Sequence, residues 1–268
     1  MNILISNDDG INSKALKALV KALSDIGDIY IVAPDSERSA NSHHITISGR
    51  MRIEEKQLDG AKKAYALWGT PCDCIRAGLK YIIKEKIDLV VSGINKGWNT
   101  THDAVYSGTV AAAREGFIQG IQSIALSLNT FEDRDYTQAS VIAKQIVLKY
   151  LQHKNVNYFL NVNIPDVAED EIKGIKVCDS IGRVEYNENY FYEEEFGVRY
   201  LVIGKTKIDL LYDQNDMNLD CVAVNEGYIT IVPLFCDEIN HDYIDEVKNI
   251  YETKWKLEYY QHQIFMDI

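Results

Sequence analysis

Short apolar runs alternate with longer amphipathic stretches over the first two-thirds of the chain. Residues 3–6 and 28–33 have the aliphatic composition of strands, and residues 13–26 between them carry apolar side chains at helical spacing. Further strands are predicted at 64–68, 87–92, 121–126 and 158–162, and further helices at 72–84, 109–116 and 135–152. Because strands that alternate with helices form parallel sheets, we expect an α/β fold with a doubly wound, mostly parallel sheet.

The pattern changes after residue 165. Runs typical of strands at 175–177, 198–203 and 228–232 follow without long helices, and an acidic, Tyr-rich stretch at 185–195 separates them. Residues 243–265 have helical composition with aromatic residues on several faces. We therefore predict a catalytic core over 1–165 and a hairpin-rich, C-terminal helical part over 166–268 that packs on the core or on another subunit.

Composition limits the partners of the chain. The 268 residues are 46% hydrophobic, which is enough for a buried core. The formal net charge of −12 argues against binding to a nucleic-acid polymer, which draws on clustered Lys and Arg to displace counterions. A phosphate ligand in so acidic a protein needs a local cation. We therefore expect a small substrate and, if that substrate is a phosphate, a metal ion.

The cysteines and the apolar runs indicate a compartment. The five cysteines are an odd number with no C-x-x-C pair, so we interpret them as reduced, mostly buried thiols and not as a zinc site. The start of the chain lacks a signal-peptide pattern, and no run approaches transmembrane length. We expect a cytoplasmic protein that does not enter a membrane.

Asn7-Asp8-Asp9-Gly10 directly follows the first predicted strand. Glycine permits a tight turn there, and such a turn aims both carboxylates at one ion. Adjacent acids that share a pocket raise each other's pKa unless a cation is near, so a metal site resolves the arrangement. The alternative is an ordinary exposed Asx turn that caps a helix.

Two further polar segments follow predicted strands. The loop at 33–44 contains Ser39 and His43, and the segment at 92–99 contains Asn95 and Asn99. Ligands of doubly wound sheets bind beyond the carboxyl ends of the strands, which favours a functional interpretation of both segments. Taken alone, a Ser- and Asn-rich loop is more often only a loop, and paired histidines are more often solvated or capping.

Residues 103–113 predict a loop that enters a helix. Backbone N–H groups at Ser107, Gly108 and Thr109 would point toward an anion, assisted by the helix N-terminus and two hydroxyls. The alternative is a capped helix of small residues packed closely on the sheet. The phosphate motifs of P-loop and dinucleotide-binding proteins are absent from the sequence.

Four motifs occur in a fixed order: N-D-D-G, a Ser-bearing A-P-D loop, S-G-I-N-x-G-x-N and Y-S-G-T-V-x-A-A. This set resembles the SurE survival-protein family of 5′-nucleotidases. Residues 68–74 and 160–165 also resemble the family's G-T-P-x-D-C and L-N-V-N-x-P segments. The resemblance covers the chain from its first residue to about residue 233 and rests on the order of motifs that are individually weak.

The resemblance implies a Rossmann-like core that hydrolyses nucleoside 5′-monophosphates to nucleoside and phosphate, with 3′-monophosphates as further candidates. It implies one divalent cation per subunit, Mg²⁺ or Mn²⁺, whose hard-oxygen ligands are Asp8, Asp9, Ser39 and Asn95. Asp8 and Asp9 are also the expected catalytic residues, and the expected phosphate contacts are Asn99, Ser107, Gly108 and Thr109. The family is cytoplasmic and forms dimers or tetramers through the C-terminal part, so we expect a homodimer or homotetramer.

Two positions depart from the family pattern. Ala40 follows Ser39 where glycine is usual, and Thr101-His102 replaces a leucine- or glycine-plus-acid pair. His43 and His102 are candidate substrate contacts and candidate donors of a proton to the leaving alcohol. A nucleotide-binding module without turnover and an exopolyphosphatase are the alternative functions.

Overall fold

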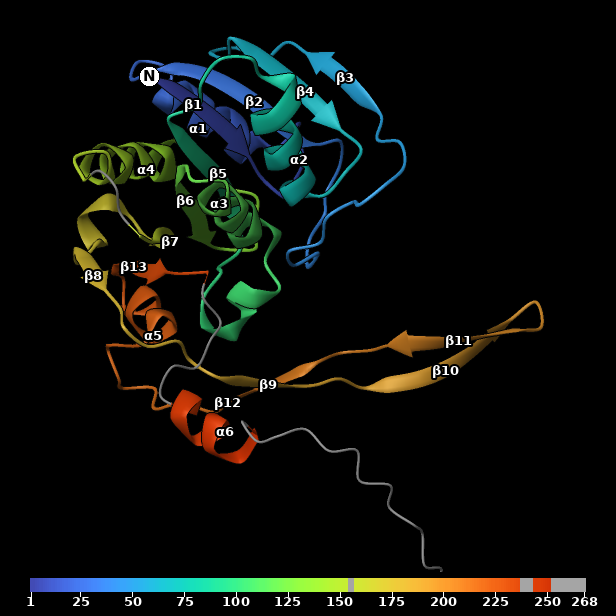
Figure 1. Ribbon diagram of the computed structural model, residues 1–268. Coiled ribbons are helices and arrows are strands. Elements are labelled where there is room, and N and C mark those ends of the chain that lie inside the picture. The colour runs from blue at the N-terminus through green and yellow to red at the C-terminus, as the bar shows by residue number, and fades with distance from the viewer. Residues whose placement is uncertain (154–156, 237–242, 252–268) are drawn as a thin grey trace, which may run out of the picture. The chain divides into compact units, whose positions relative to one another are not determined.

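A computed structural model of the chain describes residues 1–153, 157–236 and 243–251. The chain divides into two units, Met1–Cys236 and Asp237–Ile268. The first unit contains a nine-stranded sheet with helices on both faces (Figure 1). This arrangement confirms the predicted α/β fold.

The sheet is mostly parallel. Its strands are β1 (Asn2–Ser6), β2 (Asp28–Pro34), β3 (Ile53–Lys56), β4 (Lys63–Leu67), β5 (Leu89–Lys96), β6 (Gln122–Asn129), β7 (Phe159–Pro165), β8 (Ile175–Val177) and β13 (Ile229–Leu234), in the order β3-β4-β2-β1-β5-β6-β7-β13-β8. The strands from β4 to β7 are parallel, whereas β3 and β13 pair antiparallel with β4 and β7. The chain winds outward from β1 to β2 on one side and from β5 to β6 on the other, so β1 and β5 flank the switch point where ligands bind in such sheets.

Two pairs of helices cover the two faces of the sheet. The helices α1 (Lys14–Leu23) and α4 (Thr137–Tyr150) share one buried cluster with the strands. The helices α2 (Pro71–Ala77), continued by a π-helical turn at Gly78–Ile82, and α3 (Gly108–Ile118) bury their apolar residues in two other clusters. Shorter helical segments are Thr101–Val105, Glu169–Glu171 and α5 (Asp220–Asn225).

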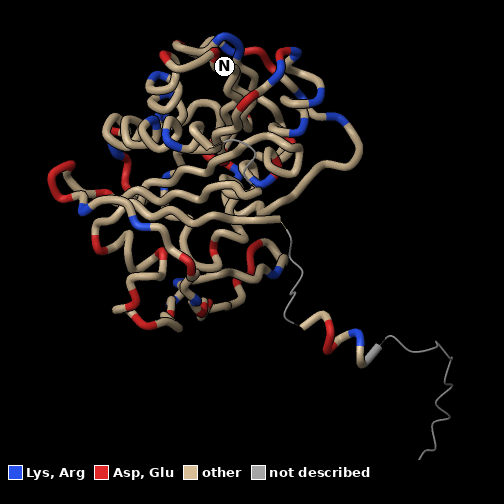
Figure 2. Tube along the Cα trace, turned by 60° about the vertical axis from the view of Figure 1, so that its left-hand side comes forward, with Lys and Arg blue, Asp and Glu red and all other residues tan. Residues whose placement is uncertain are grey.

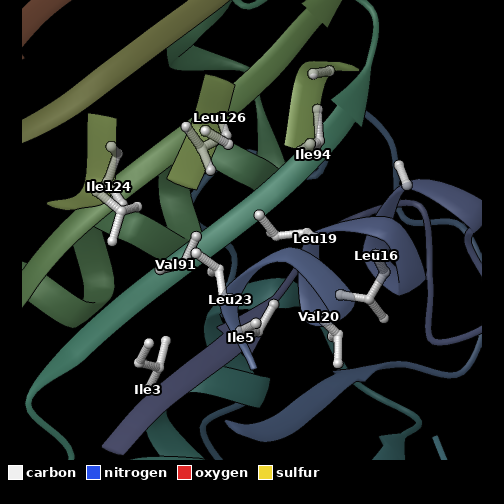
Figure 3. Close-up of a cluster of buried hydrophobic side chains, with 14 of the residues drawn as sticks. Ile3, Ile5, Leu16, Leu19, Val20, Leu23, Val91, Ile94, Ile124 and Leu126 are labelled. Atoms are coloured by element: carbon white, nitrogen blue, oxygen red, sulfur yellow. The ribbon is translucent and has the colours of Figure 1, made fainter. Parts of the chain in front are cut away.

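Helix α1 shows how the amphipathic pattern is used. Its residues Leu16, Leu19 and Leu23 are fully buried in one cluster with Ile5 and Val91 of the sheet, and Leu19 and Leu23 lie closest to these two residues in the close-up (Figure 3). Each such side chain contributes about 1.5–3 kcal/mol on burial. Ser13 begins the helix by accepting a hydrogen bond from the backbone N–H of Leu16. This packing fixes the helix against β1, the strand that precedes Asp8 and Asp9.

A long two-stranded ribbon leaves the sheet after β8. It consists of β9 (Val184–Asn187), β10 (Tyr190–Glu195), β11 (Val198–Ile203) and β12 (Lys207–Leu210), in which β9 pairs with β12 and β10 with β11 (Figure 1). The prediction that 185–195 only separates strands is wrong, because these residues form β9 and β10. Both faces of β10 are exposed, so its sequence lacks the alternation that marks a half-buried strand.

Other predictions for the C-terminal part are met in part. The strands predicted at 175–177, 198–203 and 228–232 correspond to β8, β11 and β13. The helix predicted at 243–265 begins with α6 (Ile244–Tyr251), and residues 252–265 lie outside the described part of the chain. Strands β8 and β13 extend the sheet of the predicted core, while the role of residues 166–268 in oligomerisation stays a prediction.

The cysteines that the structure describes as buried are free thiols, as the sequence predicts. Cys72, Cys74, Cys178 and Cys221 are buried and form no disulfide, and burial raises the pKa of Cys72 to about 12. Lys and Arg are interspersed with Asp and Glu along the chain (Figure 2). Among the helices that the structure describes, none combines the length and the apolar character needed to cross a membrane.

Candidate active site

The turn after β1 is held by the buried side chain of Asn7. Its Nδ2 donates to the carbonyl of Gly10 at 3.0 Å, and its Oδ1 accepts from the N–H of Gly10 at 3.2 Å. Gly10 has a φ of 94°, and a Cβ there would lie 3.0 Å from the backbone of Ser36, so the position requires glycine. The turn presents Asp8 and Asp9 at the carboxyl end of β1.

Asp8 is buried and is bound by the first turn of α3. Its Oδ1 accepts from the Thr109 hydroxyl at 2.6 Å, and its Oδ2 accepts from the Thr109 N–H at 3.2 Å. Gly108 permits this approach, since a Cβ on it would lie 2.9 Å from the Cβ of Asp8. Burial raises the pKa of Asp8, and the two bonds from Thr109 act in the opposite direction.

Asp9 lies beside Asp8 and is partly buried. Its Oδ2 accepts from the backbone N–H of Lys96 at 3.3 Å. Burial, and after it the charge of Asp8, raises the pKa of Asp9 to about 7, and Glu37 adds to the increase. The site therefore concentrates negative charge that a cation would stabilise.

The loop after β2 brings Ser39 to this turn. The backbone N–H of Arg38 donates to the carbonyl of Asp8 at 2.7 Å, which fixes the loop next to β1. Ser39 is exposed, and its hydroxyl donates to Oε1 of Glu37 at 2.7 Å. Sequence reasoning missed Glu37, a third carboxylate whose charge contributes to the raised pKa values of Asp8 and Asp9.

Asn95 lies near the end of β5, adjacent in sequence to the Lys96 N–H that binds Asp9. Its Nδ2 donates to the carbonyl of Gly97 at 2.8 Å. Because this bond uses the amide nitrogen of Asn95, its amide oxygen points away from the Gly97 carbonyl. The role of this oxygen as a metal ligand stays a prediction.

The donor types fit a hard divalent cation. Two carboxylates, a hydroxyl and an amide oxygen are ligands that Mg²⁺ and Mn²⁺ prefer, and a cation would relieve the raised pKa values of Asp8 and Asp9. Across residues 1–153, 157–236 and 243–251, no group of three or more His, Cys, Asp or Glu side chains is placed to hold a metal. The predicted set therefore depends on the oxygens of Ser39 and Asn95.

The predicted phosphate contacts at the start of α3 have partners inside the protein. Ser107 caps the helix by accepting from the N–H of Val110 at 3.1 Å, and both donors of Thr109 bind Asp8. Ala111, Ala112 and Ala113 are fully buried. This agrees with the alternative interpretation, a capped helix of small residues packed closely on the sheet. The helix N-terminus nevertheless lies at Asp8, and a phosphate contact by these residues stays a prediction.

Asn99 joins the loop after β5 to the ends of two neighbouring strands. Its N–H donates to Oδ1 of Asn163 at 2.7 Å, and its Nδ2 donates to the Ser127 hydroxyl at 2.8 Å. Its carbonyl accepts from Nδ2 of Asn161 at 2.8 Å. The two asparagines of the L-N-V-N strand thus hold this loop, a role that the sequence did not indicate.

The two candidate histidines also have protein partners. Nε2 of His43 lies 2.8 Å from Oε2 of Glu115, which is 2% exposed. Nδ1 of His102 accepts from the N–H of Val184 at 3.4 Å, and its ring lies edge-on to Tyr186. The structure places neither imidazole in contact with Asp8 or Asp9, and proton donation by either stays a prediction.

Glu115 of α3 and Asp73 of α2 are buried acids that hold the segment following Ser39. Sequence reasoning missed both roles. Glu115 binds His43, and Asp73 accepts from both the N–H and the hydroxyl of Thr46 at 2.8 Å. Burial acts to raise the pKa of Asp73, but the bonds from Thr46 and Thr70 hold it below its ordinary value. The Thr70-x-x-Asp73 capping box before α2 was the available sequence signal.

A family model described as Survival protein SurE matches residues 3–188. This chain belongs to the SurE family. The 5′-nucleotidase SurE of Clostridium botulinum (strain Alaska E43 / Type E3) is 41% identical to it over 257 residues, which are 94% of this chain and 100% of the relative. The 5′-nucleotidase SurE of Chlorobium limicola is 39% identical over 259 residues, 96% of this chain and 97% of the relative.

A solved structure agrees with the SurE assignment. The crystal structure of the SurE protein from Aquifex aeolicus matches with a TM-score of 0.77 and 33% sequence identity, covering 93% of this chain and 99% of that chain. The resemblance drawn from the ordered motifs is therefore confirmed, as is the mostly parallel α/β fold.

Thr109→Val is expected to destabilise this SurE protein. The substitution keeps the shape of the side chain but removes the hydroxyl that donates to buried Asp8, and an unpaired buried acceptor costs about 1–3 kcal/mol. Urea unfolding of the metal-free chain measures the difference. Thr109→Ser keeps the hydroxyl and is expected to stay closer to the wild type; equal stability of the valine variant and the wild type would contradict the assignment.

Proposed function

We propose that this SurE-family chain is a metal-dependent phosphomonoesterase that hydrolyses nucleoside 5′-monophosphates to nucleoside and phosphate. The observation that carries the proposal is the pair Asp8 and Asp9, with raised pKa values at the end of β1 beside the start of α3. The comparisons confirm the prediction of an enzyme of the 5′-nucleotidase type, the name that its relatives carry. Activity on 3′-monophosphates is a further candidate.

Asp8, Asp9, Ser39 and Asn95 would hold one Mg²⁺ or Mn²⁺ per subunit. When bound, the ion neutralises phosphate charge and lowers the pKa of a coordinated water. Uncatalysed hydrolysis of phosphate monoesters is so slow that catalysis must remove roughly 20 kcal/mol of barrier. Hydrogen bonds alone are too weak for this, since losing one such donor typically costs about 3–4 kcal/mol.

The chain's own groups supply orientation. Two bonds from Thr109 hold the Asp8 carboxylate in one direction, and the N-terminus of α3 favours an anion next to it. Asp9, beside Asp8 and held by the backbone N–H of Lys96, is suited to orient the attacking water. A covalent aspartyl-phosphate is less favoured because the D-x-D arrangement of aspartate phosphatases is absent.

Turnover is expected to depend on metal and on Asp8. Metal-stripped protein should release no phosphate from a panel of nucleoside monophosphates, and added Mn²⁺ or Mg²⁺ should restore release. Asp8→Asn should remove the restored activity, because it replaces a carboxylate ligand by a neutral amide. Asp59→Asn, the same change at an exposed position, is the matched control.

The same assay separates the alternative functions. Nucleotide binding without phosphate release under any metal would favour the binding module. Polyphosphate that competes strongly with a nucleoside monophosphate and is itself degraded faster would favour the exopolyphosphatase.

The histidines are tested by comparing two leaving groups. His43→Ala is expected to lower turnover of a nucleoside monophosphate and of p-nitrophenyl phosphate alike, because His43 holds the Ser39 loop through Glu115. Glu115→Gln should reproduce this pattern, and His102→Ala should change both rates little. A loss confined to the poor leaving group, of about 10²–10⁴-fold, would instead identify the general acid.

The ribbon β9–β12 supports the predicted homodimer or homotetramer. Its distal strands expose a run of large apolar side chains: Tyr190, Phe191, Tyr192, Val198, Tyr200, Leu201 and Ile203. Exposed apolar clusters of this kind mark interaction surfaces in soluble proteins. The proposed cytoplasmic location rests on the thiols and on the family resemblance, and it stays a prediction.

Sedimentation velocity of the full chain is expected to show an oligomer. Leu201→Glu places a charge on the ribbon surface and should shift the protein toward monomer. Val141→Glu, a similar change at an exposed position of α4, should leave the oligomer intact. A monomeric wild type at micromolar concentration would refute the role of the ribbon.

A further inference from the structure

A cavity of about 510 Å³ lies between the loop after β5 and the root of the ribbon. The loop contributes Trp98 and Asp103 to its wall, and the ribbon contributes Tyr186 and Ile208. Asn129, the last residue of β6, completes the side toward the sheet. None of the predicted metal ligands or phosphate contacts lines this cavity.

The cavity is near the phosphate site. Trp98 follows Asn95 by three residues, and Asn129 ends the strand next to β5. Neighbouring strands are about 4.8 Å apart, so β6 lies about 10 Å across the sheet from β1, the strand that precedes Asp8 and Asp9. The remainder of a small phosphate ester bound at Asp9 can reach that distance.

Two aromatic rings form one wall. Trp98 and Phe131 pack edge to face, with ring centroids 4.5 Å apart. Gly97 leaves room for Phe131, since a Cβ there would lie 2.7 Å from its ring. The two side chains are 37% and 61% exposed, so ring surface is available to a planar ligand.

Two acceptors on the wall lack a partner. Oδ1 of Asp103 and Oδ1 of Asn129 are buried and accept no hydrogen bond in the described part of the chain. The other atoms of these groups are occupied, because Oδ2 of Asp103 accepts from the Tyr186 hydroxyl and Nδ2 of Asn129 donates to Asn225 at 3.0 Å. Buried acceptors without a donor are costly, so the pair favours a ligand that brings N–H or O–H groups.

We propose that this cavity receives the nucleoside half of the substrate, with the base against Trp98 and Phe131. Ribose hydroxyls and ring or exocyclic N–H groups supply the donors that Asp103 and Asn129 lack. The inference rests on the proposed function and extends it, because it makes the nucleoside, and not only the phosphate, a recognised part of the substrate.

Trp98→Ala tests the proposal on two substrates. With metal added, kcat/KM for AMP is expected to fall by about tenfold or more, the effect of losing one stacking partner, while kcat/KM for glycerol phosphate stays within twofold. Tyr81→Ala removes an exposed aromatic side chain from the π-helical turn after α2, away from the cavity, and should change neither value. An equal fall on both substrates, or no fall on AMP, overturns the proposal.

Adenosine binding gives a readout that is independent of turnover. Calorimetry on metal-stripped protein should detect adenosine, and both Trp98→Ala and Asn129→Leu should weaken it at least fivefold. If the wild type hydrolyses neither AMP nor glycerol phosphate with any metal, the proposed function fails whatever adenosine does. If it hydrolyses both but binds no adenosine and does not depend on Trp98, only the nucleoside cavity is refuted.

Discussion

The hydrogen bonds from Thr109 to the buried Asp8 carboxylate are the interaction on which the site depends. They join the end of β1 to the start of α3, two segments that lie 101 positions apart in the sequence. A buried carboxylate is costly unless it is hydrogen-bonded or paired with a cation. The close approach requires Gly108 to lack a side chain and requires Asn7 to shape the turn after β1. Helix, turn and carboxylate therefore form one unit.

The same unit concentrates negative charge without a matching positive group. The charge of Glu37 disfavours the ionisation of Asp8 and of Asp9, and the charge of Asp8 disfavours that of Asp9. At Asp9 the backbone N–H of Lys96 opposes this effect, and the charge of Lys96 has the smallest effect of all. Such an arrangement lowers the stability of an empty site and favours a bound cation, a tension common where function requires perturbed groups. Glu115 of α3 and Asp73 of α2 hold the segment that carries Ser39, because they bind His43 and Thr46.

The ribbon β9–β12 takes part in both the proposed nucleoside site and the proposed subunit contact. Its root lines the cavity beside Trp98, while its distal strands expose apolar side chains that suit contact with another subunit. The Tyr186 hydroxyl binds Asp103 and so ties the ribbon to the loop that follows β5. A shift of the ribbon on assembly would change the walls of the cavity, because the two ends belong to one paired segment. The proposed phosphate and nucleoside sites thus rest on different supports, the switch point of the sheet and the ribbon.

The sequence by itself determined the order of the parallel strands and of the helices between them, and the placement of Asp8 and Asp9 after the first strand, but it did not predict the antiparallel edge strand β3. These features are local: periodicity, turn residues and motif spacing carry them. Tertiary structure alone decided that Thr109 binds Asp8, that Asn161 and Asn163 hold Asn99, and that 185–195 forms strands. The first two depend on partners at least 62 residues away in the sequence. The third is a local hairpin, in which Glu195 pairs with Val198, but neither strand of the distal ribbon buries a face that would have imposed alternation on its sequence. Hydrogen bonds between distant segments leave no periodic signal in either segment, and an exposed hairpin lacks the alternation of a half-buried strand, so only the folded chain reveals these features.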